Sequence, residues 1–112
     1  MIVEYIRYSV PPPRQTEFVT AYHEASVELN ASPHCLAYEL SHCHEEPALY
    51  MMRIEWDSLS GHMQGFRGSP EFKHFFAKVQ PFLEQIQEMR HYDVLEVVAR
   101  KSEAEQPQPP RV

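Results

Sequence analysis

The chain has 112 residues, and its 10 Lys and Arg residues against 16 Asp and Glu residues give a formal net charge of −6 at pH 7. This length suits one compact domain. The acidic balance, with no basic cluster along the sequence, argues against a nucleic-acid partner. No apolar run approaches the ~18 residues of a membrane span. Residues 1–7 also lack the apolar stretch of a signal peptide, so we expect no membrane association.

The two cysteines, Cys35 and Cys43, fall in one predicted strand over residues 35–43. At about 3.3 Å per residue, an extended strand holds them too far apart for a disulfide. Free cysteines are typical of a reduced, cytoplasmic protein. Residues 101–112 are polar and charged and contain three prolines. We therefore expect one domain over residues 1–100 and a disordered C-terminal tail over residues 101–112.

The first predicted elements are a strand and an amphipathic helix. Alternation over residues 2–9 places Ile2, Glu4, Ile6 and Tyr8 on one strand face. The following run of three prolines ends this strand, because proline cannot donate to a sheet. Apolar residues then recur at spacings of three and four, which predicts a helix that ends at Ser32. They are Phe18, Tyr22, Ala25 and Leu29.

Two further strands, residues 35–43 and 49–56, are joined by a short turn that contains Pro47. A connection this short predicts an antiparallel hairpin. In the first of these strands the alternation groups Leu36, Tyr38 and Leu40 on one face. In the second it groups Tyr50, Met52, Ile54 and Trp56.

The second half of the chain predicts two helical pieces and a last strand. Asp57 or Ser58 can cap a short helix that Gly61 and Gly65 weaken. Ser69 and Pro70 begin a longer helix, which Pro81 should kink. A last strand is predicted over residues 92–100. The expected buried stripe of the longer helix is Phe72, Phe75, Phe76, Val79, Phe82, Leu83 and Ile86.

The predicted order, β-α-β-β-α-β, is that of an α+β, ferredoxin-like fold: a four-stranded antiparallel sheet with helices on one face. Apolar residues, among them Leu49 and Met51, also lie on the other face. A second subunit stacked sheet on sheet would cover them, so we expect a homodimer. Arg53 and Glu55 share this face and should form interface ion pairs. Glu39 and Arg7 are their candidate partners.

Four stretches of the chain together carry a resemblance to a known family. They are residues 32–40 (SPHCLAYEL), residues 45–50 (EEPALY), residues 54–58 (IEWDS) and residues 69–76 (SPEFKHFF). In this order and spacing, residues 2–98 resemble the antibiotic biosynthesis monooxygenase (ABM) family of dimeric α+β barrels.

The resemblance implies a pocket between sheet and helices, lined by Trp56, His62, Met63 and Phe66. It implies a homodimeric monooxygenase that oxidises a small aromatic or quinol-type molecule with O2 and needs no cofactor. The alternative is a non-catalytic, small-ligand-binding or stress-associated module of the same fold. Haem degradation is less favoured, because the first strand lacks the asparagine of the haem-degrading members and His74 lies only near their axial position.

Histidine changes charge near neutral pH, so His62 is the candidate catalytic base that removes a phenolic proton. The other interpretation is a partly exposed histidine with no chemical role. Trp56 can stack against an aromatic ligand or serve only as core. Alternation turns Cys43 away from His42 and His44, so these three side chains cannot converge on a metal and we expect no metal site.

Overall fold

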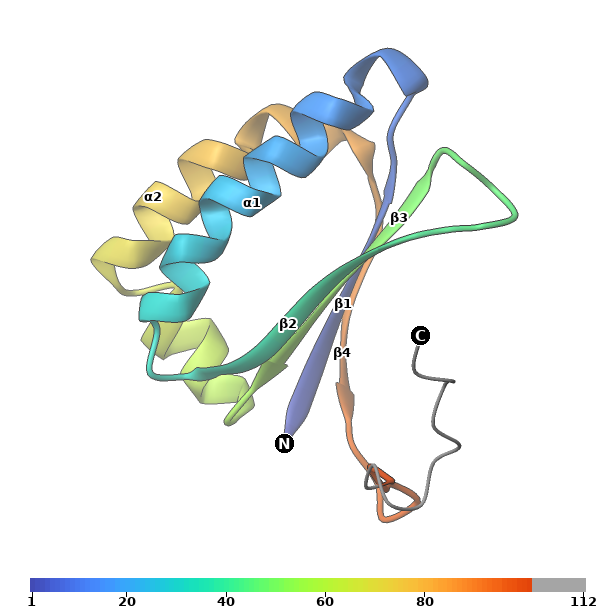
Figure 1. The fold of residues 1–112 in the computed structure, drawn as a ribbon. Coiled ribbons are helices and arrows are strands. Elements are labelled where there is room, and N and C mark those ends of the chain that lie inside the picture. Colours follow the sequence, from blue (N-terminus) through green and yellow to red (C-terminus); the bar gives the residue numbers. More distant parts are fainter. Residues whose placement is uncertain (102–112) are drawn as a thin grey trace, which may run out of the picture.

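A four-stranded antiparallel sheet carries two helices on one face in the computed structural model, which describes residues 1–101 (Figure 1). The expected β-α-β-β-α-β order and ferredoxin-like α+β class are confirmed. Apart from Lys101, the predicted tail lies outside the described residues. The elements are β1 (Ile2–Ser9), η1 (Pro12–Arg14), α1 (Gln15–Ala31), β2 (Cys35–His42), β3 (Leu49–Trp56), η2 (Gly61–Phe66), α2 (Pro70–Val79), η3 (Gln80–Gln85) and β4 (Ile86–Asp93).

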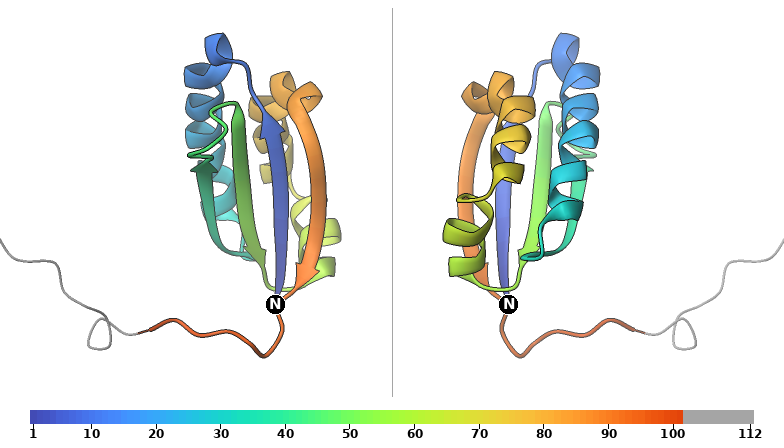
Figure 2. Two further views of the ribbon diagram at one scale, coloured as in Figure 1. Left: turned by 90° about the vertical axis from the view of Figure 1, so that its right-hand side faces the viewer. Right: turned by 90° about the vertical axis from the view of Figure 1, so that its left-hand side faces the viewer.

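The strands are ordered β2-β3-β1-β4, so the first strand of the chain lies inside the sheet, between β3 and β4. Figure 2 shows the helices covering one sheet face and leaving the other open. The register places Glu4 of β1 between Ile54 of β3 and His91 of β4. Two polar residues from opposite ends of the chain therefore meet on the face that the helices cover.

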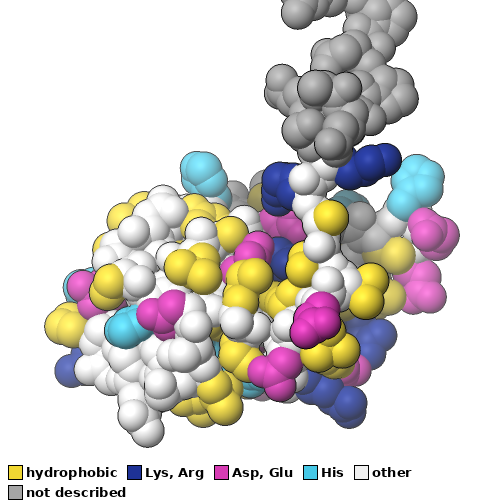
Figure 3. Space-filling view, turned by 90° about the horizontal axis from the view of Figure 1, so that it is seen from below, with side chains coloured by type: hydrophobic (Ala, Val, Ile, Leu, Met, Phe, Trp, Pro, Cys, Tyr) yellow, Lys and Arg dark blue, Asp and Glu magenta, His cyan; other side chains and the backbone are white. Residues whose placement is uncertain are grey.

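The predicted amphipathic helix is confirmed as α1, whose four apolar residues, from Phe18 to Leu29, are all buried. They pack against the inner side chains of β1 and β3, including Tyr8, Met52 and Trp56. Among the described residues, no helix is long and apolar enough to cross a bilayer. Seen from below, hydrophobic side chains are interspersed with acidic ones, in keeping with the net negative charge (Figure 3).

The last strand was predicted in the wrong place: β4 is Ile86–Asp93, not residues 92–100. Pro81 lacks an N–H and cannot continue an α-helix. Accordingly α2 ends at Val79, and the chain tightens into the 3-10 turn η3 before it enters the sheet. Where we expected a kinked helix, the structure therefore has a change from an α-helix to a 3-10 helix. Ile86 belongs to the sheet, and Leu83 is 39% exposed.

The apolar residues that suggested a strand over residues 92–100 lie mostly beyond the sheet. After Asp93 the chain runs away from it (Figure 2). Leu95 and Val98 are exposed, and Val97 is 100% exposed. Among residues 1–101, the part of this period-2 pattern that follows Val94 has no neighbouring strand.

The inner face of β2 also differs from the prediction. Cys35 pairs with Trp56 and Ala37 pairs with Glu55, so Leu36 is the extra residue of a bulge. A bulge shifts the alternation by one position, and Cys35 rather than Leu36 packs against the core. Leu36 is exposed. Both cysteines are free, as expected.

The outer sheet face carries ion pairs, but neither joins Arg53 or Glu55 to the expected partners Glu39 and Arg7. Arg53 Nη1 lies 2.7 Å from Glu55 Oε2 on its own strand, and Arg53 Nε donates to the Tyr5 hydroxyl at 3.3 Å. Arg7 Nη2 lies 2.6 Å from Glu88 Oε2 of β4. Arg53, Glu55 and Arg7 are therefore paired within one chain. The partner of Arg7, Glu88, was not considered because the last strand had been predicted over residues 92–100.

Candidate functional site

A cavity of about 260 Å³ lies between the inner face of the sheet and the helical layer. Its polar lining groups are Glu4, His62 and Arg67, with the hydroxyl groups of Tyr8 and Tyr22. The rest of the lining is aromatic and aliphatic, which suits a flat, mostly apolar ligand. These residues are Ile6, Ile54, Trp56, Phe66, Phe72, Phe75, Phe76, Val79, Leu83, Ile86 and Met89.

His62 is held on the indole of Trp56 at one end of this lining. The two rings are stacked, with centroids 4.3 Å apart and planes 14° apart. The Trp56 Nε1–H donates to Glu4 Oε1 at 3.1 Å. The same carboxylate oxygen lies 3.5 Å from His62 Nε2. Glu4 and His62 are only 2% and 3% exposed, so both polar side chains are buried and rely on these contacts.

His91 of β4 completes a chain of polar contacts across the sheet. Its Nε2 lies 2.7 Å from Nδ1 of His62. Two tautomeric arrangements satisfy this contact. In one, His91 donates to His62 and His62 donates toward Glu4. In the other, His62 donates to His91, and the lone pair of its Nε2 faces Glu4 and is available to accept a proton.

Burial sets the protonation of these groups. Desolvation lowers the pKa of His62 to about 3, and electrostatic interactions with Arg67 and His91 act in the same direction. Burial and then Arg67 also lower the pKa of His91. Burial raises the pKa of Glu4, while the Trp56 hydrogen bond and Arg67 partly oppose that rise. Both imidazoles are therefore neutral at pH 7, and each keeps one nitrogen lone pair.

Arg67 supplies the cation of the cavity. It follows η2 directly, and its backbone N–H donates to the His62 carbonyl at 3.1 Å. Its Nε is buried and has no hydrogen-bond partner among the described residues. A buried donor without a partner is costly. A ligand oxygen is one group that would satisfy it.

Tyr8 and Tyr22 form a second polar group in the cavity lining, and their hydroxyl groups hydrogen-bond to each other. Burial raises the pKa of Tyr8 to about 12, and it raises that of Tyr22 well above its usual value. Both phenols therefore stay protonated at neutral pH and can act only as hydrogen-bonding groups there.

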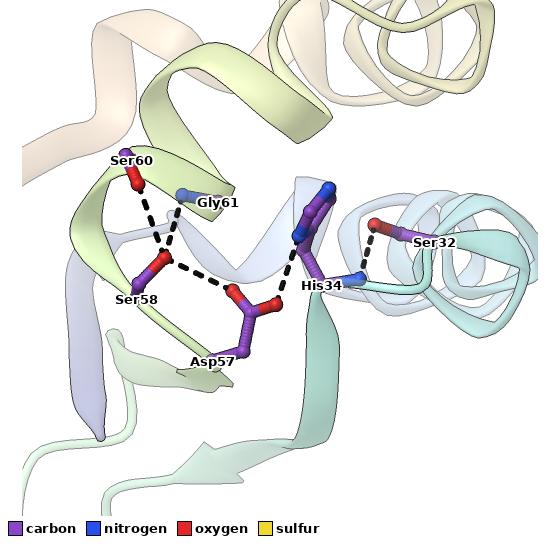
Figure 4. Close-up of polar contacts among 6 residues, drawn as sticks. All are labelled: Ser32, His34, Asp57, Ser58, Ser60 and Gly61. Carbon is purple, nitrogen blue, oxygen red and sulfur yellow. Dashed lines mark hydrogen bonds and ion pairs between the residues drawn. The ribbon is translucent and has the colours of Figure 1, made fainter.

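The segment that carries His62 is anchored at the ends of two strands (Figure 4). His34 Nδ1 lies 2.9 Å from Asp57 Oδ2, and the Gly61 backbone N–H donates to Ser58 Oγ at 2.9 Å. Ser58, one of the two predicted capping residues, thus accepts a hydrogen bond from the first residue of η2, and Ser60 is the residue that directly precedes this helix. A Cβ on Gly65 would lie 2.5 Å from the His34 ring, and one on Gly61 would overlap the Asp57 carboxylate. These glycines therefore permit close packing.

Three of the four predicted site residues, Trp56, His62 and Phe66, line the cavity. Met63 does not: it is 41% exposed and lies outside the lining. The reason is the π-helical geometry of η2, whose wide turn puts residues four to five apart on one face. His62 and Phe66 share the inner face, and the neighbouring Met63 is turned to solvent.

Sequence reasoning missed three polar groups of the site: Glu4, Arg67 and His91. Glu4 was visible as the acidic residue among the inward-facing positions of the first strand. His91 was hidden because the last strand was placed six residues too late, from residue 92 instead of 86. His74, considered as a haem ligand, has a side chain that is 73% exposed. His42 stacks on Tyr50, with centroids 4.2 Å apart.

These features define an α+β protein of ferredoxin-like topology with an aromatic cavity under its helices. The sequence model of the antibiotic biosynthesis monooxygenase family matches residues 1–78. The chain belongs to this family, as the resemblance predicted. It is 30% identical to the uncharacterised protein YczJ of Bacillus subtilis over 78 residues, which are 70% of this chain and 82% of that protein.

Solved structures agree with this assignment at the level of the fold. A candidate antibiotic biosynthesis monooxygenase from Bordetella bronchiseptica superposes with a TM-score of 0.70 at 24% identity, covering 84% of this chain and 96% of that one. Rv0793 from Mycobacterium tuberculosis gives 0.68 at 15% identity, covering 88% and 98%. At such identities the likeness shows the common fold alone.

Proposed function

We propose that the protein is a monooxygenase that uses O2 to oxidise a small aromatic or quinol-type substrate in this cavity, without a resident cofactor. The observation that carries the proposal is a buried, neutral histidine, His62, at the polar end of an otherwise aromatic and aliphatic cavity. Family membership supports the same class of reaction. At about 260 Å³, the cavity is smaller than the ~300–1,000 Å³ typical of ligand pockets, which favours one or two fused rings.

In the proposed reaction, the Nε2 lone pair of His62 accepts the proton of a phenolic hydroxyl. The unpaired Nε–H of Arg67 stabilises the phenolate oxygen. The phenolate passes one electron to O2, and the resulting superoxide and aryloxyl radical form a carbon–oxygen bond. The O–O bond of this peroxide then breaks. One oxygen atom stays on the ring, and the other leaves as water.

The electron balance of this reaction needs no external reductant. For 1,4-dihydroxynaphthalene, one O2 yields one 2-hydroxy-1,4-naphthoquinone and one water. The substrate supplies all four electrons that reduce O2. The protein's part is to remove the proton, orient the ring against Trp56 and exclude water.

Oxygen uptake by the full chain with 1,4-dihydroxynaphthalene tests this function. We expect one O2 consumed per hydroxyquinone formed and no accumulation of H2O2, which uncatalysed oxidation would release. His62→Gln should lower kcat, because it removes the proposed proton acceptor. His74→Gln, in which an exposed histidine is changed, is the matched control and should keep full activity. Equal rates for wild type and His62→Gln would remove His62 from the mechanism.

A second candidate function is a non-catalytic, small-ligand-binding module. It is favoured by the pairing of the cavity's polar groups with one another: Glu4 with Trp56, His62 with His91, and Tyr8 with Tyr22. Ligand-dependent quenching of Trp56 fluorescence without oxygen uptake, across a panel of quinols and phenols, would support this function over the first.

We also propose that the protein works as a cytoplasmic homodimer joined through the outer sheet face. That face has a hollow lined by Tyr5, Arg7, Met51, Glu88 and Tyr92, which mixes apolar and paired charged side chains as protein interfaces do. The exposed apolar residues beyond β4 would gain burial against a second copy. Sedimentation velocity at micromolar concentration should give a dimer, and a stable monomer would contradict the proposal.

A further inference from the structure

Three metal-ligating side chains from distant parts of the sequence meet at the polar end of the cavity. They are Glu4 of β1, His62 of η2 and His91 of β4. One ligand atom from each lies within 4.8 Å of the other two. The β1–β4 register sets Glu4 directly opposite His91, and the stacking on Trp56 brings the His62 ring over both.

Two imidazoles and one carboxylate form a donor set that suits divalent transition-metal ions. Such sets hold Zn²⁺ and Fe²⁺ in proteins and leave coordination positions open for water or substrate. Mg²⁺ and Ca²⁺ prefer oxygen ligands. We propose that Glu4, His62 and His91 form a binding site for a divalent transition-metal ion such as Zn²⁺.

Ligation by all three residues requires His91 Nε2 to leave its 2.7 Å contact with Nδ1 of His62 and to move toward the other two ligand atoms. Two ligand atoms on one tetrahedral Zn²⁺, with bonds of about 2.1 Å, lie about 3.4 Å apart. His62 Nε2 and Glu4 Oε1 already lie 3.5 Å apart. His91 has to approach this pair, and it is the half-buried member of the three, on an edge strand. The ion would therefore bind to a fixed pair of ligands, with His91 closing over it.

The surroundings of the three ligands favour metal binding in one respect and oppose it in another. Trp56 donates its Nε1–H to Glu4 Oε1 and stacks on the His62 ring, so it orients two ligands as an outer-shell partner does. Arg67 lies in the same cavity, and its positive charge opposes a second cation. We therefore expect reversible binding rather than a permanently loaded site.

A bound ion would have a consequence for the proposed oxidation. It would take the Nε2 lone pair of His62, which is the group proposed to accept the substrate proton. Zn²⁺ should therefore inhibit oxygen uptake, and a chelator should restore it. The binding itself does not depend on the proposed function, because it can be measured without any substrate.

The test is a titration of the full, metal-free chain with ZnSO4 and with CoCl2. Trp56 is the single tryptophan of the chain and contacts two of the three ligands, so its fluorescence reports the site directly. We expect one site-bound ion per chain, a change in Trp56 fluorescence on Zn²⁺ binding, and visible absorption bands of Co²⁺ with nitrogen ligands.

His62→Ala and His91→Ala should each abolish the Zn²⁺-dependent fluorescence change, and Glu4→Gln should weaken binding at least tenfold. Far-ultraviolet circular dichroism of each variant checks that it is folded. His91→Ala, on the half-exposed edge strand, is the variant expected to fold best. His44→Ala and His74→Ala are the controls and should bind as wild type does. Unchanged binding by folded His91→Ala, or no fluorescence response of wild type to either ion, would overturn the proposal.

Discussion

The two faces of the sheet hold their charges in different ways. On the outer face, Arg53 pairs with Glu55 and Arg7 with Glu88 at 2.6–2.7 Å, in side chains that keep part of their surface in water. On the inner face, Glu4 is 2% exposed, and its nearest partners are an indole N–H and a neutral histidine. Partly solvated ion pairs contribute little to stability, whereas a buried carboxyl group with weak partners lowers it. A stability cost of this kind on the inner face is expected where the buried groups serve a function.

The largest expected effect of a single change is on the indole that organises the inner face. Trp56 is fully buried and is also the hydrogen-bond donor to Glu4. Trp56→Ala should lower the free energy of unfolding by about 3–5 kcal/mol, because it leaves a large cavity. Urea denaturation followed by circular dichroism measures this. Leu36→Ala, at the exposed bulge, should stay within about 0.5 kcal/mol of wild type; similar losses for both variants would contradict the assigned core.

The second prediction concerns acid stability of the metal-free protein. Burial lowers the pKa of His62 to about 3, whereas an unfolded histidine titrates near pH 6.5. Between these values the unfolded chain binds one more proton than the folded one. His62 should therefore reduce stability as pH falls below 6.5, by about 1.4 kcal/mol per pH unit.

The comparison that isolates this effect is His62→Gln against wild type, with His74→Gln as the exposed control. Glu4, whose pKa is raised by burial, acts with the opposite sign: its contribution to stability falls as pH rises above 4.5. Glu4 is present in all three proteins, so its contribution to the pH dependence of stability largely cancels in the comparison. If the stability difference between wild type and His62→Gln were the same at pH 5 and pH 7.5, His62 would not be a buried, neutral histidine.

The third prediction tests why glycine stands at position 65. Gly65→Ala should cost about 1–3 kcal/mol, because the new methyl group overlaps the His34 ring. His34→Ala removes that ring, so the double variant should recover most of the loss. A double-mutant cycle in thermal or urea denaturation measures the coupling. Additive effects of the two changes would show that the close approach of η2 to the strand ends is not set by His34.

The smallest expected effect is on the outer face. Arg53→Met in a dilute, monomeric sample should change the free energy of unfolding by no more than about 1 kcal/mol, as exposed ion pairs do. If the same change strongly raises the dimer dissociation constant in sedimentation equilibrium, the pair belongs to the proposed interface. No effect on either quantity would show that the Arg53–Glu55 pair does not belong to the proposed interface.

Much of the fold followed from the sequence because burial repeats at the period of each element. The residues from Phe18 to Leu29 and the alternation of β3 predicted their elements correctly. The position of the last strand could not be predicted, because apolar residues continue past Asp93. Their pattern does not reveal whether this segment pairs with a strand of the same chain or with another molecule. The bulge at Leu36 left no signal in composition, since it depends on the register with β3.

The site was only partly predictable for a related reason. His62 and Trp56 lie within one short stretch of the chain, so local sequence could suggest that they meet. The contacts of Glu4 with His62 and of His62 with His91 join residues that are far apart in the sequence, and they depend on strand order. Met63 was misplaced because a π-helical turn redistributes side chains that an α-helix would group.

The central claim is that a small aromatic molecule is oxidised in the cavity at His62. The most direct measurement is mass spectrometry of the product formed from 1,4-dihydroxynaphthalene under ¹⁸O2. We predict that wild type gives 2-hydroxy-1,4-naphthoquinone with one ¹⁸O atom and that His62→Gln gives only the uncatalysed background. Unlabelled product, or equal labelled yields from both proteins, would contradict the account.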